Sequence, residues 1–472
     1  MSFEFSFRPF LLASAAIIAT SASAEAFQKD DKPKPWRLND QLETPGWLRF
    51  SGDMHARMEM VDNQFRRGAP DPTDQALLLK SHLRMEADAG DLTFVVELED
   101  ARAYFDDERT ALSTGVVNAL DFLEANIRYN AGDAFGAGTD TVMKLGRQAI
   151  DQGSRRVLGR NIFRNTTNAF TGLRSVTRFA DGDFVDLFLV SPVRRLPDDD
   201  PSLQRNDIEL DEDAFNIWFA NAFYHFDNLP GGLKLDTYIH GYFESDTTDN
   251  QTENRNYYSP GARLWLPKKP GAFDFEAEYI RRFGTRRATD DPTDVTDLTL
   301  AGVAMLHAEV GYTIDWALQT RFTIEYDHAT GDKDPNDNRY NRHDNIFNLR
   351  RPDLGNNGIF GPLSFENLEA FGSMLEWTDR GRWSGRAIAK ATWRDSAFDE
   401  LTVAELSDPD GSLSRYTGFL FDGYIRYWAV PDVFNIEFGW SVLTGSDFRR
   451  DAEGSPSGGT TAYGYTQLRF IF

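Results

Sequence analysis

Two pairs of glutamates have a spacing that could support acid–base chemistry. Glu97 and Glu99 in "FVVELED", and Glu276 and Glu278 in "FDFEAEY", are two residues apart in segments that alternate like strands. Such side chains share one face of a strand and lie about 6.6 Å apart, at the lower edge of the carboxylate separation in inverting glycosidases. Polar–apolar alternation produces such pairs by default, and no apolar pocket marks either glutamate as a proton donor. The pairs do not favour an enzyme.

One loop carries oxygen ligands at a regular spacing. In "GDKDPNDN", Asp332, Asp334, Asn336 and Asn338 occupy every second position, which suits Ca²⁺. The loop lacks the Gly at the sixth position and the Glu at the twelfth that an EF-hand requires. A structural Ca²⁺ and solvent-facing turn residues both remain open as interpretations. Because Cys is absent and the seven His are scattered, no zinc site and no other cofactor is expected.

The segments that must position these side chains alternate with a period of two residues. In "RWSGRAIAKATWR", Arg386 and Lys390 fall on one face of an extended strand, and Trp383 and Trp393 fall on the other. The same pattern predicts an all-β chain of about 18 strands. They lie near residues 47–59, 76–89, 91–104, 120–131, 139–148, 171–180, 183–192, 214–225, 231–244, 257–268, 271–283, 299–311, 315–328, 367–379, 381–394, 416–427, 431–444 and 460–472.

The predicted connections alternate in length. Short ones include "FADGD" and "TDRGR", whereas long ones such as "RRLPDDDPSLQRNDIELDED" are rich in acidic residues. Outer-membrane barrels have short periplasmic turns and long extracellular loops. A soluble sandwich or propeller would rarely place a cation, an acid and a histidine on one face of most strands, and no blade-length repeat is present. A transmembrane antiparallel β-barrel with long acidic extracellular loops is therefore favoured.

The composition agrees with a barrel. The chain has 37 Phe, 16 Tyr and 10 Trp but no Cys, so an exported form would depend on packing and backbone pairing rather than on disulfides. Its mean hydropathy is −0.49, which is compatible with a barrel because lipid-facing and lumen-facing residues average out. The formal net charge of −24 argues against nucleic acid as a partner, since phosphates attract Lys and Arg.

The two ends of the sequence suggest export and membrane assembly. Arg8, an apolar stretch and the small residues "ASA" before Glu25 predict a signal peptide over residues 1–24. The expected domains are then a periplasmic segment, residues 25–46, and a barrel, residues 47–472. The final strand places Leu468, Phe470 and Phe472 on its lipid side, a pattern that suits outer-membrane lipid and the barrel-assembly machinery as partners.

The predicted lumen face carries charges of both signs, and two interpretations stay open. Rings of arginine bind carboxylates well and would select anions, whereas cross-strand ion pairs would only stiffen the wall. The predicted inward cations are Arg49, Arg57, Arg84, Arg128, Arg263, Arg321, Arg386, Lys390, Arg394, Arg426 and Arg469. The predicted inward acids are Asp53, Glu59, Glu86, Glu97, Glu99, Glu124, Glu276, Glu278, Glu325 and Glu437.

The stretch "MKLGRQAIDQGSRRVLGRNIFRNTTNAFTGLRSV", residues 143–176, resembles the alginate-export family of outer-membrane porins. The similarity rests on "LGRQ" at a strand end, on the basic loop after it, and on spaced arginines in the early strands. Members are eighteen-stranded barrels with an arginine-lined constriction that passes a polyuronate. By position, the resemblance implies a substrate path lined by Arg57, Arg84, Arg128, Arg147, Arg386 and Arg469, supported by His55 and Asn126.

The sequence departs from that family in one connection. Exporters have a long periplasmic loop late in the chain that can plug the inner mouth, but here the connection is only "WAVPDV". The resemblance implies passive passage of an anionic polysaccharide or oligosaccharide, with periplasmic polysaccharide-handling proteins as partners. The departure keeps a general anion-selective or sugar-acid uptake porin open. A polysaccharide-degrading enzyme and an adhesin are less favoured.

Overall fold

The computed structural model describes residues 35–67, 73–106, 112–456 and 458–472. The expected signal peptide, residues 1–24, lies outside the described residues, as does the first part of the expected periplasmic segment. Within the rest of that segment, α2 (Leu38–Gln41) is a single helical turn. No helix in the described part of the chain combines the length and the apolar character needed to cross a membrane.

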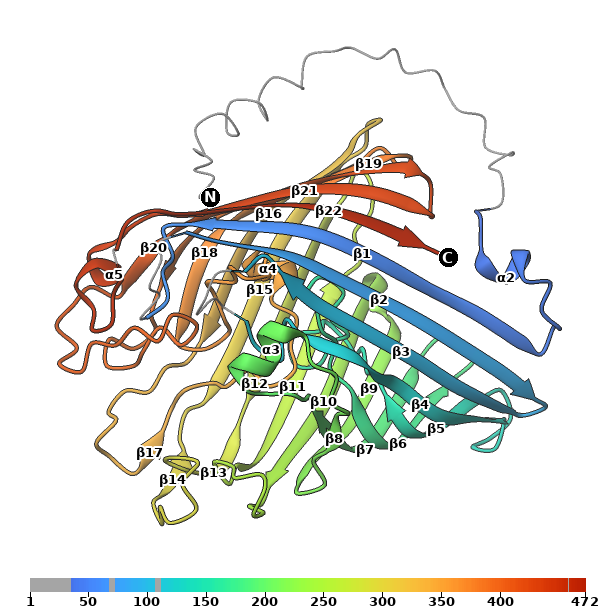
Figure 1. The fold of residues 1–472 in the computed structure, drawn as a ribbon, viewed down its shortest axis with the longest axis horizontal. Helices are drawn as coiled ribbons and strands as arrows, with labels where there is room; N and C mark the ends of the chain where they lie inside the picture. Colours follow the sequence, from blue (N-terminus) through green and yellow to red (C-terminus); the bar gives the residue numbers. More distant parts are fainter. Residues whose placement is uncertain (1–34, 68–72, 107–111, 457) are drawn as a thin grey trace. The chain divides into compact units, whose positions relative to one another are not determined.

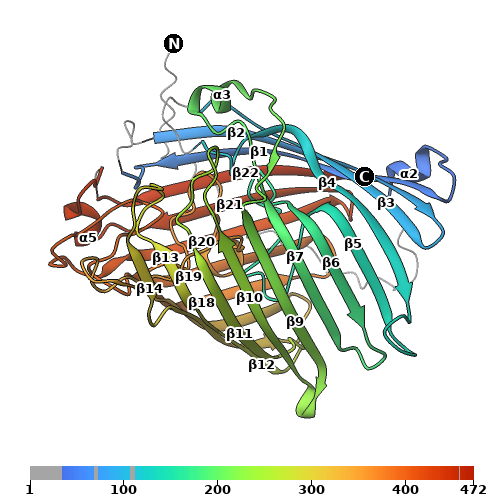
Figure 2. The same cartoon turned by 90° about the horizontal axis from the view of Figure 1, so that it is seen from below.

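Eighteen strands form one closed antiparallel barrel, as the sequence predicts. Closure occurs where β1 pairs on one side with β2 and on the other with β22, which leaves no open edge. Figures 1 and 2 both show β1 and β22 side by side. The barrel strands are β1 (Leu48–Asp62), β2 (Thr73–Ala89), β3 (Leu92–Tyr104), β4 (Asn118–Gly132), β5 (Asp140–Gln148), β6 (Phe170–Arg178), β7 (Phe184–Arg194), β9 (Ile217–Leu229), β10 (Leu233–Glu244), β11 (Asn256–Leu266), β12 (Phe273–Arg281), β15 (Ala304–Ile314), β16 (Gln319–Ala329), β18 (Leu368–Thr378), β19 (Trp383–Trp393), β20 (Tyr416–Val430), β21 (Phe434–Leu443) and β22 (Thr461–Ile471).

The long connections carry the remaining elements. These are the short strands β8 (Glu212–Asp213), β13 (Phe283–Arg287), β14 (Asp297–Leu300) and β17 (Arg339–Tyr340), and the helices α3 (Asp200–Arg205), α4 (Arg351–Leu354) and α5 (Asp447–Asp451). The 3-10 turn η1 (Pro230–Gly232) lies instead in the short connection between β9 and β10. The strand predicted from residue 299 begins only at Ala304, because β14 pairs with β13 and β17 outside the barrel ladder. In Figure 1, α5 and β14 lie at one end of the barrel and α2 lies toward the other.

The two faces of each strand differ in chemistry. On β1, His55, Arg57 and Glu59 are buried toward the lumen, while the adjacent Met54 is 53 % exposed on the outside. Large apolar side chains repeat on the outer face around the barrel, where a bilayer would cover them. Examples are Leu83, Phe94, Leu173, Val310, Ile324, Phe371, Phe421 and Phe438.

Candidate functional site

Two long connections fold into the lumen. Inner loop 1 (residues 149–169) follows β5, and inner loop 2 (residues 330–367) follows β16. Lys80, buried on the inner face of β2, donates to the carbonyl O of Asn161 at 3.3 Å. The N–H of Ile359 donates to a buried carboxylate of β1 at 2.6 Å. Because buried wall side chains bond to their backbones, both loops lie inside the barrel.

The inner loops also bond to each other. Arg156 forms a bidentate ion pair with Asp353, with Nε–Oδ2 and Nη2–Oδ1 distances of 2.9 and 3.0 Å. The N–H of Gly159 donates to the carbonyl O of Phe347 at 3.1 Å. Contacts of this kind hold the two loops as one body across the pore.

An aromatic ring fixes the inner loops against the wall near β22. The ring of Phe163 lies between two guanidinium groups, with the Cζ atoms of Arg57 and Arg351 at 4.1 and 4.0 Å from its centroid. Arg351 also pairs with Glu437 on β21 at 2.7 Å and donates to the hydroxyl of Tyr465 at 2.8 Å. Desolvated cation–π contacts and buried ion pairs lose much of their stabilisation if one partner is removed.

Two of the arginines implied by the family resemblance hold these loops. Arg57 pairs with Glu59 at 2.5 Å and donates to the carbonyl O of Phe163 at 2.7 Å. Arg386 on β19 donates to the carbonyl O of Arg351 at 2.7 Å. Both guanidinium groups are buried and bond to loop backbone, so their geometry is that of anchoring groups.

Arg469 and His55 lie directly opposite each other on β22 and β1. Both contact the carboxylate of Asp53, with Arg469 Nη2 at 3.0 Å from Oδ2 and His55 Nε2 bonded to the same oxygen. His82 binds the other oxygen of Asp53 at 2.9 Å. This acidic side chain therefore gathers three basic groups near the end of the barrel that holds the short turns.

Arg84 and Arg128 are brought together by one carboxylate. Each lies close to Oε1 of Glu86, at 3.0 and 3.1 Å, and Arg84 pairs in addition with Glu97 at 2.5 Å. Arg128 is the more accessible of the two, since its side chain is 26 % exposed and its Nε makes no hydrogen bond. The structure thus leaves part of the Arg128 side chain accessible.

The side chain of Asn126 contacts the backbone of Arg147 and not its guanidinium group. Asn126 donates to the carbonyl O of Arg147 at 2.9 Å and to Glu124 at 3.2 Å. The guanidinium of Arg147 pairs with Asp213, in the connection between β7 and β9, at 3.3 Å, and with Asp121 at 3.4 Å. Its contacts therefore join strand β5 to an outer loop.

Sequence reasoning missed a row of three cations on consecutive strands. Arg128 on β4 lies opposite Lys144 on β5, and Lys144 lies opposite Arg174 on β6. Arg174 is paired with Asp186 at 2.7 Å, but within the described part of the chain the ammonium of Lys144 has no hydrogen bond or ion pair. Like charges placed opposite each other repel, and in this basic row (Arg128, Lys144 and Arg174) carboxylates pair with Arg128 and Arg174. The row becomes visible only when the pairing of β4, β5 and β6 is known, and polar–apolar alternation does not give that pairing.

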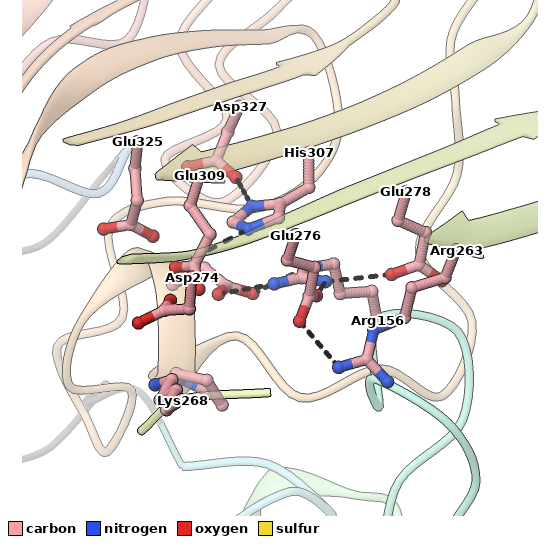
Figure 3. Close-up of polar contacts among 12 residues, drawn as sticks. Arg156, Arg263, Lys268, Asp274, Glu276, Glu278, His307, Glu309, Glu325 and Asp327 are labelled. Atoms are coloured by element: carbon pink, nitrogen blue, oxygen red, sulfur yellow. Dashed lines mark hydrogen bonds and ion pairs between the residues drawn. The ribbon is translucent and has the colours of Figure 1, made fainter. Parts of the chain in front are cut away.

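The two glutamate pairs are neutralised by cations. Arg156 bonds to Glu276 and lies 2.9 Å from Glu278, as Figure 3 shows, and Arg263 lies 2.6 Å from Glu276. In the other pair, on β3, Glu97 pairs with Arg84 at 2.5 Å. Glu99 lies 2.9 Å from His82. Since all four glutamates contact basic groups, none of them resembles a proton donor in an apolar pocket.

The oxygen-rich loop forms local turns. Oδ1 of Asp332 accepts from the N–H groups of Lys333 and Asn341 at 3.1 and 3.2 Å. Oδ1 of Asp334 accepts from the N–H of Asn336 at 3.0 Å, and the side chains of Asp334, Asn336 and Asn338 are exposed. Side chains engaged with neighbouring backbone suit a turn, and the Ca²⁺ site stays a prediction.

A family model described as alginate export matches residues 46–462. The chain belongs to the alginate export family. This match covers the barrel from before β1 into β22, and so includes the basic row and both inner loops. No curated protein sequence matches the chain.

Solved porins share the fold of this alginate export family member. OpdK from Pseudomonas aeruginosa has a TM-score of 0.55 at 11 % identity, covering 90 % of this chain and 98 % of that one. OccK9 (OpdG) from the same species has a TM-score of 0.58 at 11 % identity, covering 90 % and 98 %. A BenF-like porin from Pseudomonas fluorescens has a TM-score of 0.58 at 9 % identity, covering 90 % and 100 %. The protein is an outer-membrane channel of a Gram-negative bacterium, with the family and fold of porins rather than of enzymes.

Proposed function

We propose that the channel passes anionic saccharides of the alginate-like polyuronate class by passive diffusion, along a path that includes Arg84, Arg128 and the basic row. The observation that carries this proposal is Lys144, a lumen cation without a carboxylate partner between two guanidinium groups. A uronate carboxylate would fill that position, because Arg and Lys donors bind carboxylates by charge-assisted hydrogen bonds.

The other arginines implied by the resemblance take a different part in the proposal. Arg57 and Arg386 hold the inner loops, and Arg147 and Arg469 pair with Asp213 and Asp53. Their charges add to the field in the pore, where low-dielectric walls focus it. Among the residues of the proposed path, Lys144 is the cation without a carboxylate partner and would make the direct contact to substrate.

A sugar-acid uptake porin is the second candidate. The cross-linked inner loops favour it, because the Arg156–Asp353 pair joins them in the lumen and narrows the space for a continuous polymer. Monomeric and short uronates would pass beside the loops, whereas a long chain would require the loops to move.

Current block by uronates tests the proposal and separates the two candidates. Guluronate monomer, short oligomers and long alginate are added to single channels in planar bilayers. Block by uronates that weakens in Lys144→Gln supports the anionic path, while Lys234→Gln is the matched control because Lys234 already contacts Asp227. Oligomer block without passage of the long polymer favours uptake. Equal block of wild type and Lys144→Gln contradicts the proposed path.

A further inference from the structure

Strands β15 and β16 bring a histidine and three acids together on the lumen wall. His307 lies opposite Asp327, and Glu309 lies opposite Glu325, so the four side chains form a square on one face of the sheet. One possible ligand atom from each of His307, Glu325 and Asp327 lies within 4.8 Å of the others, and all three residues are buried. Figure 3 shows the four side chains, with Asp327 and Glu309 linked to the imidazole ring by dashed lines.

Asp327 sets the tautomer of the histidine. Nδ1 of His307 lies 2.7 Å from Oδ1 of Asp327, and a neutral imidazole that donates from Nδ1 keeps a lone pair on Nε2. A carboxylate behind a histidine is the usual arrangement around a metal-bound imidazole, where it orients the ring and raises its basicity.

Two buried atoms in this square have no hydrogen-bond partner. They are Nε2 of His307 and Oε2 of Glu325, in residues that are 0 % and 1 % exposed. Nε2 faces Oε2 of Glu309 at 3.9 Å, too far for a hydrogen bond. Two buried acceptor atoms without a donor, within one cluster of side chains, favour a cation beside them.

The neighbouring cations do not fill this space. Lys390 binds Oδ2 of Asp327 at 2.6 Å and Oε1 of Glu325 at 3.3 Å, and it donates to the carbonyl O of Asp353 at 2.7 Å. Its ammonium therefore has three acceptors of its own. Arg321 approaches the opposite oxygen of Glu309, Oε1, at 2.8 Å. These contacts use other atoms and leave Nε2 of His307 and Oε2 of Glu325 unpaired.

We propose that His307, Glu309 and Glu325 bind a divalent transition-metal ion of the zinc class, with Asp327 as the positioning residue. One nitrogen and two carboxylate oxygens suit Zn²⁺, with water completing the sphere, and suit Ca²⁺ poorly because of the imidazole. The ion would join β15 to β16 at a position independent of the saccharide path.

Isothermal titration of the purified full-length protein in detergent tests this site, with Zn²⁺ and the spectroscopic probe Co²⁺. One equivalent of metal is expected to bind, with a visible Co²⁺ band typical of nitrogen and oxygen ligands. Binding should be lost in His307→Asn and Glu325→Gln, and weakened by roughly 10–100-fold in Asp327→Asn. His240→Asn is the control, because His240 is also buried with an unpartnered nitrogen, and its ring lies against the aromatic rings of Phe219 and Tyr238.

Anomalous diffraction from Zn²⁺-soaked crystals of the wild-type protein gives an answer that does not depend on the variants folding. A zinc peak at bonding distance from Nε2 of His307 supports the site. Absence of saturable binding, or a peak elsewhere, overturns it and identifies His307 as an imidazolium that pairs with Asp327 and Glu309.

Discussion

Arg156 and Asp353 form a bidentate ion pair in the lumen although they are 197 residues apart in the chain. The remaining nitrogen of Arg156, Nη1, lies 2.9 Å from Glu278 on β12. A single guanidinium therefore links inner loop 1, inner loop 2 and the barrel wall. The loops and the wall therefore share one set of ion pairs.

Replacing Arg156 should widen the channel. Arg156→Gln leaves the carboxylates of Asp353 and Glu278 buried without their partner, and breaking a buried pair in this way costs about 3–5 kcal/mol. We expect the inner loops to detach and the single-channel conductance to rise and fluctuate. Arg155→Gln is the matched control, because Arg155 pairs with Asp151 on the exposed side of the same loop. Equal conductance of wild type and Arg156→Gln would show that the loops do not limit the current.

Gly372→Ala should destabilise the barrel. A methyl group at Gly372 would lie 2.1 Å from the carbonyl O of Ala389 and 2.6 Å from Cγ of Lys390, whose side chain crosses this glycine to reach β16. Overpacking of this kind costs about 1–3 kcal/mol. The unfolding temperature, measured on gels as the temperature at which the band of the folded form disappears, should fall. Gly464→Ala should change it little, since the nearest atom to its new methyl would be 3.8 Å away, and an equal fall in both variants would refute the steric explanation.

The connection between β7 and β9 should become less protected as the pH rises through 6. Burial raises the pKa of Asp211 to about 6, whereas an unfolded Asp titrates near 3.9. The native loop therefore holds a proton that the unfolded loop lacks between about pH 4 and pH 6, and this stabilisation is lost above that window. Hydrogen exchange of residues 195–211, corrected for intrinsic rates, should show this loss. Asp211→Asn should flatten the pH dependence, and protection that increases with pH would contradict the assignment.

Much of the barrel follows from the sequence because a strand has a fixed period of two. Once Arg386 and Lys390 are assigned to one face of β19, the opposite face must be apolar, and the eighteen-strand prediction is confirmed for this reason. Loops have no such period. The meeting of Arg156 with Asp353 depends on the path of two long connections, and nothing local in either segment encodes it.

The lumen contacts were less predictable than the lumen face. Alternation gives the face of a strand, but the neighbours of Lys144 depend on the register between β4, β5 and β6. Gly146, with a φ of +120°, lies two residues after Lys144 and packs against the backbone of Ala125. Such a local distortion of the strand shifts side chains in a way that polar–apolar spacing does not reveal.

The most direct test of the account is the reversal potential of single channels across a salt gradient. The sequence carries a formal charge of −24, so a pore governed by total charge would prefer cations. The long outer loops are rich in acids, and salt screens such charges beyond about 8 Å, while the basic row acts within the confined pore. We predict anion selectivity that falls in Lys144→Gln and Arg128→Gln but not in Lys234→Gln. A cation-selective wild-type channel, or no change in the basic-row variants, would contradict the account.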